Sequence, residues 1–413
     1  MEKYTGKKPL IRFPEFKAPW EHRQLSDLLS ESKKRNDDLK FGKDEVLSVS
    51  GESGIVNQIE HLGRSYAGVS VHQYHVVNTG DIVYTKSPLK ENPYGIIRLN
   101  KGKAGIVSTL YAVYSVNKIN ADAHFLDCYF SLDANTNRYL RPLVKKGAKN
   151  DMKVNNEYVL NDKIFVPTLS EQKCIASFFS VIDKKILKLK EKESLLEQYK
   201  KGVVQKIFSQ KIKLKDRKGN AFPEWIDTTI GEIATVSAGA TPNTQKSEYW
   251  NGKIRWMNSG ELNLKRVLEV ENRITKIGLE NSSTKLLPKY CVLIGLAGQG
   301  KTRGTVAMNY VELCTNQSIA AILPNNKTFD SEFLYHNLDN RYDELRIMSK
   351  GDGGRGGLNL QIIKAMKIRL PSMEEQKEIG CFLKQIDMKL DAVRVYIRQS
   401  EQYKKGLLQK MFC

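Results

Sequence analysis

The stretch Val166-Pro167-Thr168-Leu169-Ser170-Glu171-Gln172-Lys173 returns later in the chain as Leu370-Pro371-Ser372-Met373-Glu374-Glu375-Gln376-Lys377. The likeness continues without a gap, so that residues 166–209 recur as residues 370–413 at a constant offset of 204 (370 minus 166). Both copies end on a shared Glu-Gln-Tyr-Lys-Lys-Gly and a final apolar turn. A duplication of this length predicts a chain built from two similar halves.

Each copy begins with the signals of a helix start. A proline precedes Thr168-x-x-Glu171 and Ser372-x-x-Glu375, capping boxes in which a hydroxyl and a carboxylate accept hydrogen bonds from free backbone N–H groups. Apolar residues then recur at spacings typical of a coiled-coil seam. They are Ile175, Phe178, Ile182, Ile186, Leu189, Leu196, Tyr199, Val203 and Ile207, then Ile379, Phe382, Ile386, Leu390, Val393, Ile397, Tyr403, Leu407 and Met411. The pattern predicts two helices, each about 55 Å long.

The connection between the helices predicts their orientation. The segment from about 210 to 369 leaves the end of the first helix and returns to the start of the second, and the ends of a compact domain often lie close together. We therefore expect an α/β (α+β) fold of two globular domains separated by two long antiparallel coiled-coil helices, with a pseudo-twofold internal repeat. The expected boundaries are 1–165, 166–209, 210–369 and 370–413.

The two globular regions open alike and then diverge. Phe13-Pro14-Glu15-Phe16 in the first corresponds to Phe222-Pro223-Glu224-Trp225 in the second. Beyond these openings they share little except short β-like runs such as 81–84 and 291–294. Similar frames with different interiors predict two readers of different targets.

The charge of the chain points to a polyanionic partner. Its 413 residues carry 66 Lys and Arg against 46 Asp and Glu, a formal charge of +20. Basic side chains that neutralise phosphates release counterions, so nucleic acid is the leading candidate. A basic surface that keeps the protein dissolved, or that docks an acidic subunit, is the competing interpretation.

Cysteine usage and the chain start indicate the compartment. The six cysteines, at 128, 174, 291, 314, 381 and 413, are scattered and form no C-x-x-C pair. This argues against a zinc site or a disulfide framework and predicts a reducing, cytoplasmic setting. Residues 1–8 are polar and charged and no apolar run has membrane-spanning length, so we expect neither export nor a membrane partner.

Residues 295–302, Gly-Leu-Ala-Gly-Gln-Gly-Lys-Thr, match the G-x-x-x-x-G-K-T pattern of phosphate-binding loops. A β-like run precedes them, but Arg303-Gly304-Thr305-Val306 disfavours the helix that such a loop requires. No later apolar strand ends in an acidic residue for magnesium. A DNA-stimulated P-loop ATPase therefore stands as the alternative function, and contact with DNA is the preferred role of this loop.

Distinctive strings accompany the repeat. They are the Leu-Pro-x-x-Glu-Gln-like helix starts, the Glu-Gln-Tyr-Lys-Lys-Gly segments, Gly239-Ala240-Thr241-Pro242, Tyr249-Trp250, Ile254-Arg255-Trp256, Gly80-Asp81-Ile82-Val83-Tyr84 and Gly105-Ile106-Val107-Ser108-Thr109-Leu110-Tyr111. Together they extend over nearly the whole chain, which resembles the specificity subunits of type I restriction-modification systems.

The resemblance implies a function. Residues 1–165 and 210–369 would be two target-recognition domains, each reading one half of a gapped sequence in double-stranded DNA. The helices would fix the number of unread base pairs, and a rod of the predicted length can place two readers roughly one 34 Å turn of DNA apart. They would also dock two modification (methyltransferase) subunits. This chain would be non-catalytic; S-adenosylmethionine would bind to those subunits, and Mg/ATP to restriction (translocase/nuclease) subunits.

Candidate DNA contacts are side chains that donate to phosphates or base edges from glycine-rich or polar loops. In the second domain they are Gln299, Lys301, Thr302, Arg303, Asn316, Gln317, Lys350 and Arg355. In the first domain they are Lys86, Ser87, Asn92, Tyr94, Ser108, Tyr111, Lys145, Lys146 and Lys149. Tight turns with exposed charges compete with DNA contact for each side chain, and core packing competes for both tyrosines.

Three further patterns bear on function. Apolar residues expected on the outer helix faces, Phe179, Leu195, Val204 and Leu383, predict partner docking and disfavour an orphan DNA-binding protein acting alone. Asn92-Pro93-Tyr94 is similar to the N-P-P-Y motif of amino-methyltransferases but lacks the second proline, so it predicts a turn. His72 and His75 lack a third ligand, so no metal site is expected.

Overall fold

The computed structural model describes residues 8–51, 53–68, 70–86, 92–146, 152–216, 218–298, 300–349 and 357–412, and of residues 145–146 and 152–153 only the backbone. Contacts divide the chain into two compact units, residues 1–191 with 395–413 and residues 192–394. Each long helix contributes one part to each unit. None of the helices in the described ranges combines the length and apolar character needed to cross a membrane.

The first unit contains a globular domain followed by the start of a long helix. Its main strands and helices are β1 (Glu21–Gln24), β2 (Leu29–Glu31), β3 (Leu47–Ser50), β4 (Gly54–Asn57), α1 (Gln58–Leu62), β5 (His75–Val77), β6 (Ile82–Thr85), β7 (Ile96–Leu99), β8 (Gly105–Val107), β9 (Tyr111–Val116), α2 (Ala123–Phe130), α3 (Asp133–Leu140), β10 (Lys145–Lys146), β11 (Met152–Lys153), β12 (Lys163–Val166) and α4 (Leu169–Phe208). The helix α4 lies inside the range predicted for the first repeat.

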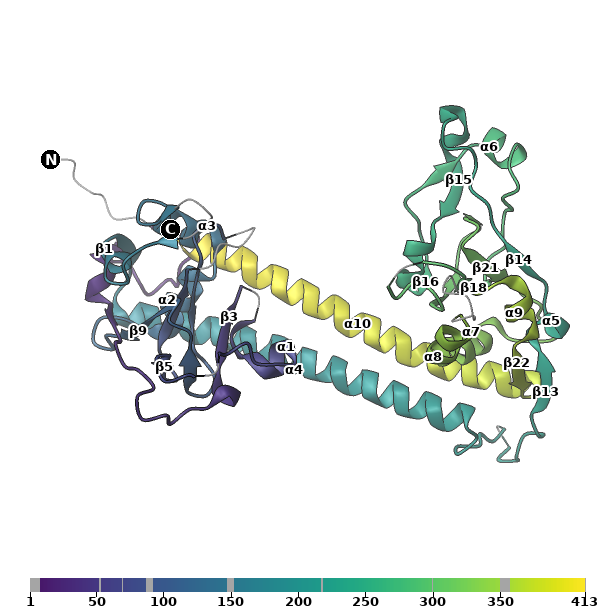
Figure 1. Ribbon diagram of the computed structural model, residues 1–413, viewed down its shortest axis with the longest axis horizontal. Coiled ribbons are helices and arrows are strands. Elements are labelled where there is room, and N and C mark those ends of the chain that lie inside the picture. Colours follow the sequence, from purple (N-terminus) through teal and green to yellow (C-terminus); the bar gives the residue numbers. More distant parts are fainter. Residues whose placement is uncertain are drawn as a thin grey trace. The chain divides into compact units, whose positions relative to one another are not determined.

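The second unit contains the second domain and the start of the other long helix. Its elements are β13 (Ile226–Thr229), α5 (Ile230–Ile233), β14 (Val236–Ala238), β15 (Trp250–Met257), β16 (Arg266–Val267), β17 (Arg273–Ile274), α6 (Lys276–Glu280), β18 (Val292–Gly295), β19 (Val306–Asn309), β20 (Cys314–Thr315), β21 (Ile319–Ile322), α7 (Ser331–Asp339), α8 (Tyr342–Met348), α9 (Leu360–Ala365), β22 (Lys367–Leu370) and α10 (Met373–Met411). Figure 1 shows α4 in teal and α10 in yellow.

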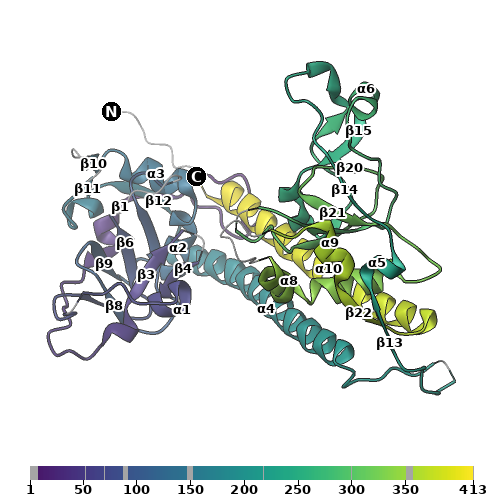
Figure 2. The same cartoon turned by 45° about the vertical axis from the view of Figure 1, so that its right-hand side comes forward.

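The two domains share one sheet topology. In the first the antiparallel order is β2-β9-β6-β7, and in the second it is β14-β21-β18-β19, with β16 added beside β19. Figure 2 shows β6 and β9 side by side in the first unit and β14 and β21 side by side in the second. The sequences of the two domains diverge, yet four strands of each follow the same order. Different apolar sequences can fill equivalent buried strands, because a strand requires only a suitable pattern of burial.

A strand pair joins each domain to its helix. The strand β1 pairs antiparallel with β12, so that Glu21 lies opposite Val166 immediately before α4. The strand β13 pairs in the same way with β22, placing Ile226 opposite Leu370 immediately before α10. The entry and exit of each domain are thus hydrogen-bonded neighbours.

The helix segments run antiparallel within each unit. In the first unit Asp183 of α4 pairs with Lys404 of α10, and Lys190 pairs with Glu401 at 2.7 Å. Residue numbers therefore increase along α4 in the direction in which they decrease along α10. In the second unit Lys200 pairs with Asp387 at 2.6 Å. The pairs Asp183–Lys404 and Asp387–Lys200 are equivalent under the 204-residue repeat, which confirms the predicted antiparallel arrangement locally in each unit.

The buried face of each helix is broader than the predicted seam. Phe179 and Leu383 are fully buried, whereas their neighbours Phe178 and Phe382 are only partly covered. The predicted seam residues Tyr199 and Tyr403 are exposed. The reason is that each helix packs against a domain core as well as against the other helix, which requires a wider apolar stripe than a coiled-coil seam.

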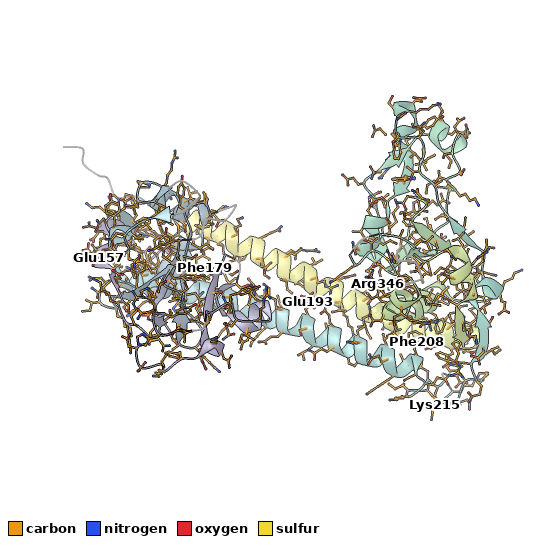
Figure 3. The ribbon with its side chains drawn as sticks, viewed as in Figure 1. Glu157, Phe179, Glu193, Phe208, Lys215 and Arg346 are labelled. Carbon is orange, nitrogen blue, oxygen red and sulfur yellow. The ribbon has the colours of Figure 1, made fainter. Side chains whose placement is uncertain are left out.

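Three expected docking residues belong to these cores. Phe179, Val204 and Leu383 are at most 6% exposed and pack within the domain clusters, so their assignment to the outer faces is wrong. Figure 3 places Phe179 inside the first unit. Leu195 is 65% exposed and does lie on the surface.

The helix starts form half of the predicted capping box. The hydroxyls of Thr168 and Ser372 accept from the backbone N–H of Glu171 and Glu375 at 3.5 and 3.3 Å. The two carboxylates instead accept from distant side chains: Glu171 accepts from Trp20 at 3.2 Å and from Arg12 at 2.7 Å, and Glu375 accepts from Trp225 at 3.1 Å. The reciprocal half of the box is replaced by a tertiary contact that ties each domain opening to its helix.

A buried charge cluster attaches the second domain to its helices. Arg266 of β16 bonds Glu332 of α7 and Asp387 of α10, both at 2.9 Å, while Lys200 of α4 also reaches Asp387. Burial alone would raise the pKa of the Asp387 carboxyl, but the Lys200 charge and bonds from Lys200 and Arg266 lower it overall. The carboxylate is therefore held ionised by the cations around it.

The first unit has a corresponding cluster. The buried Asp127 of α2 accepts from Arg98 at 3.0 Å and pairs with Lys101 at 2.8 Å. Lys101 also lies 3.7 Å from Asp183, the partner of Lys404. In both units a single connected set of charges thus links the sheet, the following helix and the long helices.

Removing the Asp387 charge is expected to destabilise the second unit. Asp387→Asn leaves two largely buried cations with one fewer counter-charge, so we expect a loss on the order of 3 kcal/mol in the free energy of unfolding. Urea denaturation followed by circular dichroism measures it. Asp391→Asn, at a site with 62% side-chain exposure on the same helix, should change the free energy by no more than about 0.5 kcal/mol. Equal effects would exclude a special role for the cluster.

Buried His336 predicts a pH dependence. Burial lowers the pKa of His336 to about 4, against an ordinary value of 6.5, so it stays neutral when folded. As pH falls below 6.5 the unfolded state binds this proton first, and stability falls until pH reaches about 4. From pH 8 to pH 4.5 the His336→Gln variant should therefore lose about 2.5 kcal/mol less than the unsubstituted chain. Urea melts across this range, with His72→Gln as control, test it; parallel pH profiles of unsubstituted chain and His336→Gln would contradict it.

Candidate nucleic-acid interface

Three loops of the second domain lie together at one end of the strands of its main sheet. Strands β14 and β18 end there, at Ala238 and Gly295, and strands β21 and β19 begin there, at Ile319 and Val306. We call residues 239–246, 296–305 and 316–318 the second loop edge. The antiparallel pairing of the strands brings these segments together although they are distant in sequence.

The loop 296–305 connects two strands. It joins β18 to the antiparallel β19, so the strand predicted before the G-x-x-x-x-G-K-T pattern is present and a second strand follows where a nucleotide-binding loop requires a helix. Gly304 has φ +79°, a left-handed conformation suited to glycine. This hairpin geometry lacks the helix N-terminus that would face a nucleotide phosphate.

Side chains of helix α8 hold the backbone of this loop. Arg346, labelled in Figure 3, donates to the Gly300 carbonyl at 2.9 Å. The Tyr342 hydroxyl donates to the Lys301 carbonyl at 3.2 Å, and the Thr305 hydroxyl donates to the same carbonyl at 2.6 Å. The backbone at Lys301 is therefore fixed while its side chain is exposed, an arrangement that suits a phosphate contact.

The other candidates of the second domain differ in accessibility. Thr302 and Arg303 are half-buried, and the amide oxygen of Asn316 accepts from the Ser318 backbone at 3.1 Å, which commits it to the turn. Gln317 is exposed and contacts the Thr241 hydroxyl at 2.7 Å. Three predicted residues lie outside the described residues: Gln299, Lys350 and Arg355.

The first domain has an equivalent edge. Strand β6 ends at Thr85, opposite Tyr111 at the start of β9, so that Lys86, Ser108 and Tyr111 lie at one edge. We call residues 86, 92–95 and 108–111 the first loop edge. Burial lowers the pKa of Lys86, and burial raises the pKa of Tyr111, so both side chains are partly covered by the domain.

Two predicted contacts of the first domain serve the fold. Asn92 is 4% exposed and donates to Asp133 at 2.7 Å, so its assignment to a DNA surface is wrong. The backbone of Asn92 also accepts from Gly95, which confirms the predicted turn. Tyr94 packs against the core, and its carbonyl accepts from the Tyr84 hydroxyl at 2.8 Å, which favours the competing core interpretation.

The remaining basic candidates of the first domain lie near or beyond the described segments. Lys145 and Lys146 form β10, paired with β11, and only their backbone is described. Ser87 and Lys149 lie outside the described residues.

The candidate segments occupy equivalent positions in the two domains. The connections β6–β7 and β18–β19 correspond, and so do the turns before β9 and β21. These segments were selected for their residue types, yet the topology makes them pairwise equivalent. This agreement favours one shared role for both edges.

The sequence interpretation missed the loop 239–246 as a contact surface. It entered only as a distinctive string, although Thr241, Asn243 and Lys246 are polar and exposed and Thr241 contacts Gln317. The sequence feature that marks this loop is the polar run that follows a short strand. Among the described residues no group of three or more His, Cys, Asp and Glu side chains is arranged to hold a metal ion.

Comparison with known families gives a match over both halves of the chain. The family model described as "Type I restriction modification DNA specificity domain" matches residues 17–198 and 223–395.

Individual relatives share between 23% and 28% of their residues with this chain. The specificity subunit of the Escherichia coli enzyme EcoR124I/EcoR124II is 28% identical over 195 residues, 45% of this chain and 48% of that protein. The Methanocaldococcus jannaschii MjaIX subunit is 28% identical over 45% of this chain and 42% of its own length. The match thus spans about half of these two relatives. The putative MjaX subunit is 23% identical over 95% of this chain and 93% of that protein.

Solved structures show a similar fold. The S subunit of a type I restriction-modification system from M. genitalium has a TM-score of 0.63 at 15% identity, covering 98% of this chain and 99% of that one. A second chain, from a type I R-M system, has a TM-score of 0.55 at 18% identity and covers 96% of this chain and 97% of its own. At these identities the likeness concerns the fold.

The second loop edge predicts a specific effect of Lys301→Ala. Loss of one phosphate contact should weaken binding to duplex DNA about fivefold and make the dependence of log affinity on log salt shallower by about 0.9. Fluorescence anisotropy at several salt concentrations measures both quantities.

Lys289→Ala is the matched control for this experiment. Lys289 is also exposed but precedes β18 at the opposite end of the strand, away from the loop edge. An equal loss in the two variants would show that charge alone, and not this edge, determines binding.

Proposed function

We propose, for a chain that belongs to the type I restriction-modification DNA specificity family, that its two loop edges each read one half of a bipartite, gapped DNA sequence. The observation that carries this proposal is the pairing of equivalent loop edges on two domains of one topology. Equivalent positions give both domains the same way of approaching a duplex. Different side chains at those positions give them different half-sites.

Base reading requires donors and acceptors on well-supported backbones. Such side chains discriminate base edges in the major groove, while basic side chains contact phosphates and set the register of the protein on DNA. The exposed Lys301 on a fixed backbone fits the second task, and the exposed Gln317 fits the first. The charge of +20 supports an affinity that depends on salt.

We assign no catalytic role to this chain. Methyl transfer with S-adenosylmethionine would take place on two modification subunits, and Mg/ATP would be used by restriction subunits. The helix surfaces offer exposed apolar residues for docking, and Leu195 is the one among them that the sequence had suggested. Exposed apolar residues suited to contact helices of another subunit are Leu195 and Tyr199 on α4 and Met388, Tyr396 and Tyr403 on α10.

The helix pair would act as the spacer between half-sites. The helices α4 and α10 contain 40 and 39 residues, a length of about 60 Å each at 1.5 Å per residue. A protein spacer of fixed length would set how many base pairs lie unread between the two recognition domains. Affinity for each half-site would then be independent of spacer length.

Sequencing of methylated adenines tests the proposed function directly. The host should lack methylation and carry this chain with a cognate modification subunit that has been shown to assemble with it. We expect a gapped two-part motif that disappears when this chain is omitted. Assembly without any such motif would contradict the proposal.

Insertion of one heptad into both helices tests the spacer. A heptad in each helix preserves the side-chain register across the pair, so the two half-site sequences should persist while the gap lengthens. An insertion in α4 alone should misalign pairs such as Lys200–Asp387 and reduce stability. Changed half-sites with an unchanged gap, read from the methylated sequences, would contradict the spacer role.

A further inference from the structure

The loop 239–243 is clamped by two indole donors. Trp256 donates to the Ala240 carbonyl at 3.0 Å, and Trp250 donates to the Asn243 carbonyl at 3.2 Å. The two rings pack edge-to-face with centroids 5.1 Å apart, so each supports the other. The carbonyls of Ala240 and Asn243 are thereby held by side chains of β15.

The same loop is pressed against the end of β20. The Ala240 N–H donates to the Thr315 carbonyl at 2.9 Å. A Cβ at Gly239 would lie 1.9 Å from that carbonyl oxygen, so only glycine permits this approach. The loop therefore has a fixed backbone on both sides, although its tip is exposed.

The facing turn is also fixed. The Asn316 N–H donates to the Met257 carbonyl at 3.0 Å, and the Ser318 N–H donates to the Asn316 side chain at 3.1 Å. Between these two anchored residues stands Gln317, exposed and without a place in the core. Its backbone is thus held while its side chain extends from the sheet edge.

One hydrogen bond connects the two fixed segments. The Thr241 hydroxyl donates to the side-chain amide oxygen of Gln317 at 2.7 Å. An isolated glutamine amide can rotate and present either its oxygen or its nitrogen, but this bond engages the oxygen with Thr241 and leaves the NH₂ group available as a donor. A Gln side chain with a set orientation can distinguish bases that a rotating one cannot.

We propose that Gln317 is a specificity-determining residue and Thr241 its positioning residue, with the Gln317 NH₂ donating to an acceptor on a base edge. This rests on the proposed function. In the major groove guanine, adenine and thymine each present an acceptor, whereas cytosine presents only its amino donor. The pair therefore excludes cytosine at one position of the half-site read by the second domain.

Three variants test the pair in the assembled methyltransferase, by the same sequencing of methylated adenines. Thr241→Val keeps the side-chain shape and removes the donor, so methylation of sites with the excluded base should rise about tenfold at one position. Thr241→Ser keeps the hydroxyl and should retain the motif of the unsubstituted chain. Gln317→Glu still accepts from Thr241 but offers no NH₂, and should alter that same position without disturbing the core.

The outcomes separate the two proposals. The affected position should lie in one half-site only, and the sequence of the other half-site should be unchanged. An unaltered motif in Thr241→Val, degeneracy at several positions, or different positions affected by the Thr241 and Gln317 variants would overturn the pair while leaving the proposed function intact. Absence of any gapped motif with the unsubstituted chain would overturn both.

Discussion

Two ion pairs across the long helices, Asp183 with Lys404 and Asp387 with Lys200, are the constraint on which the rest of the structure depends. Each aspartate also belongs to a charge cluster that continues into the neighbouring domain, through Lys101 or Arg266. Apolar packing supplies most of the burial and tolerates substitution by apolar side chains of similar volume. A partly buried ion pair is more demanding, because a shift along the helix axis leaves desolvated charges without partners. The pairs therefore specify register and the domain's place on its helix together.

The architecture was largely predictable because the repeat is a linear property of the sequence. A constant offset identifies two like helices, and the connection between them gives their orientation. Which face each helix buries was not predictable, since Phe178 and Phe179 differ by one position and the domain cores decide between them. The same holds for Glu171, whose pattern indicates a cap but whose carboxylate binds an indole distant in sequence. Local signals gave element type, and tertiary contacts gave partners.

The candidate interface was predictable as loops and only partly as side chains. Glycine, lysine and polar residues between β-like runs located the segments around Lys301 and Gln317, because irregular polar loops carry contacts in many folds. They did not show that the buried Asn92 side chain donates a hydrogen bond to Asp133, because that depends on which helix packs against the turn. Nor could they show that Thr241 and Gln317 meet, since 76 residues separate them and only sheet pairing brings them together.

The strand pairs at the domain bases have a consequence for how such a protein can change. Glu21 lies opposite Val166, and Ile226 lies opposite Leu370. The first and last strands of each domain are therefore hydrogen-bonded to each other, next to the start of a long helix. A segment whose two ends meet can be replaced by another of different length without moving the structure that holds it. The chain is thus organised as a permanent frame with two exchangeable inserts. On the function proposed above, grafting an insert would change the half-site that is read, while the contacts of the two helices stay as they are.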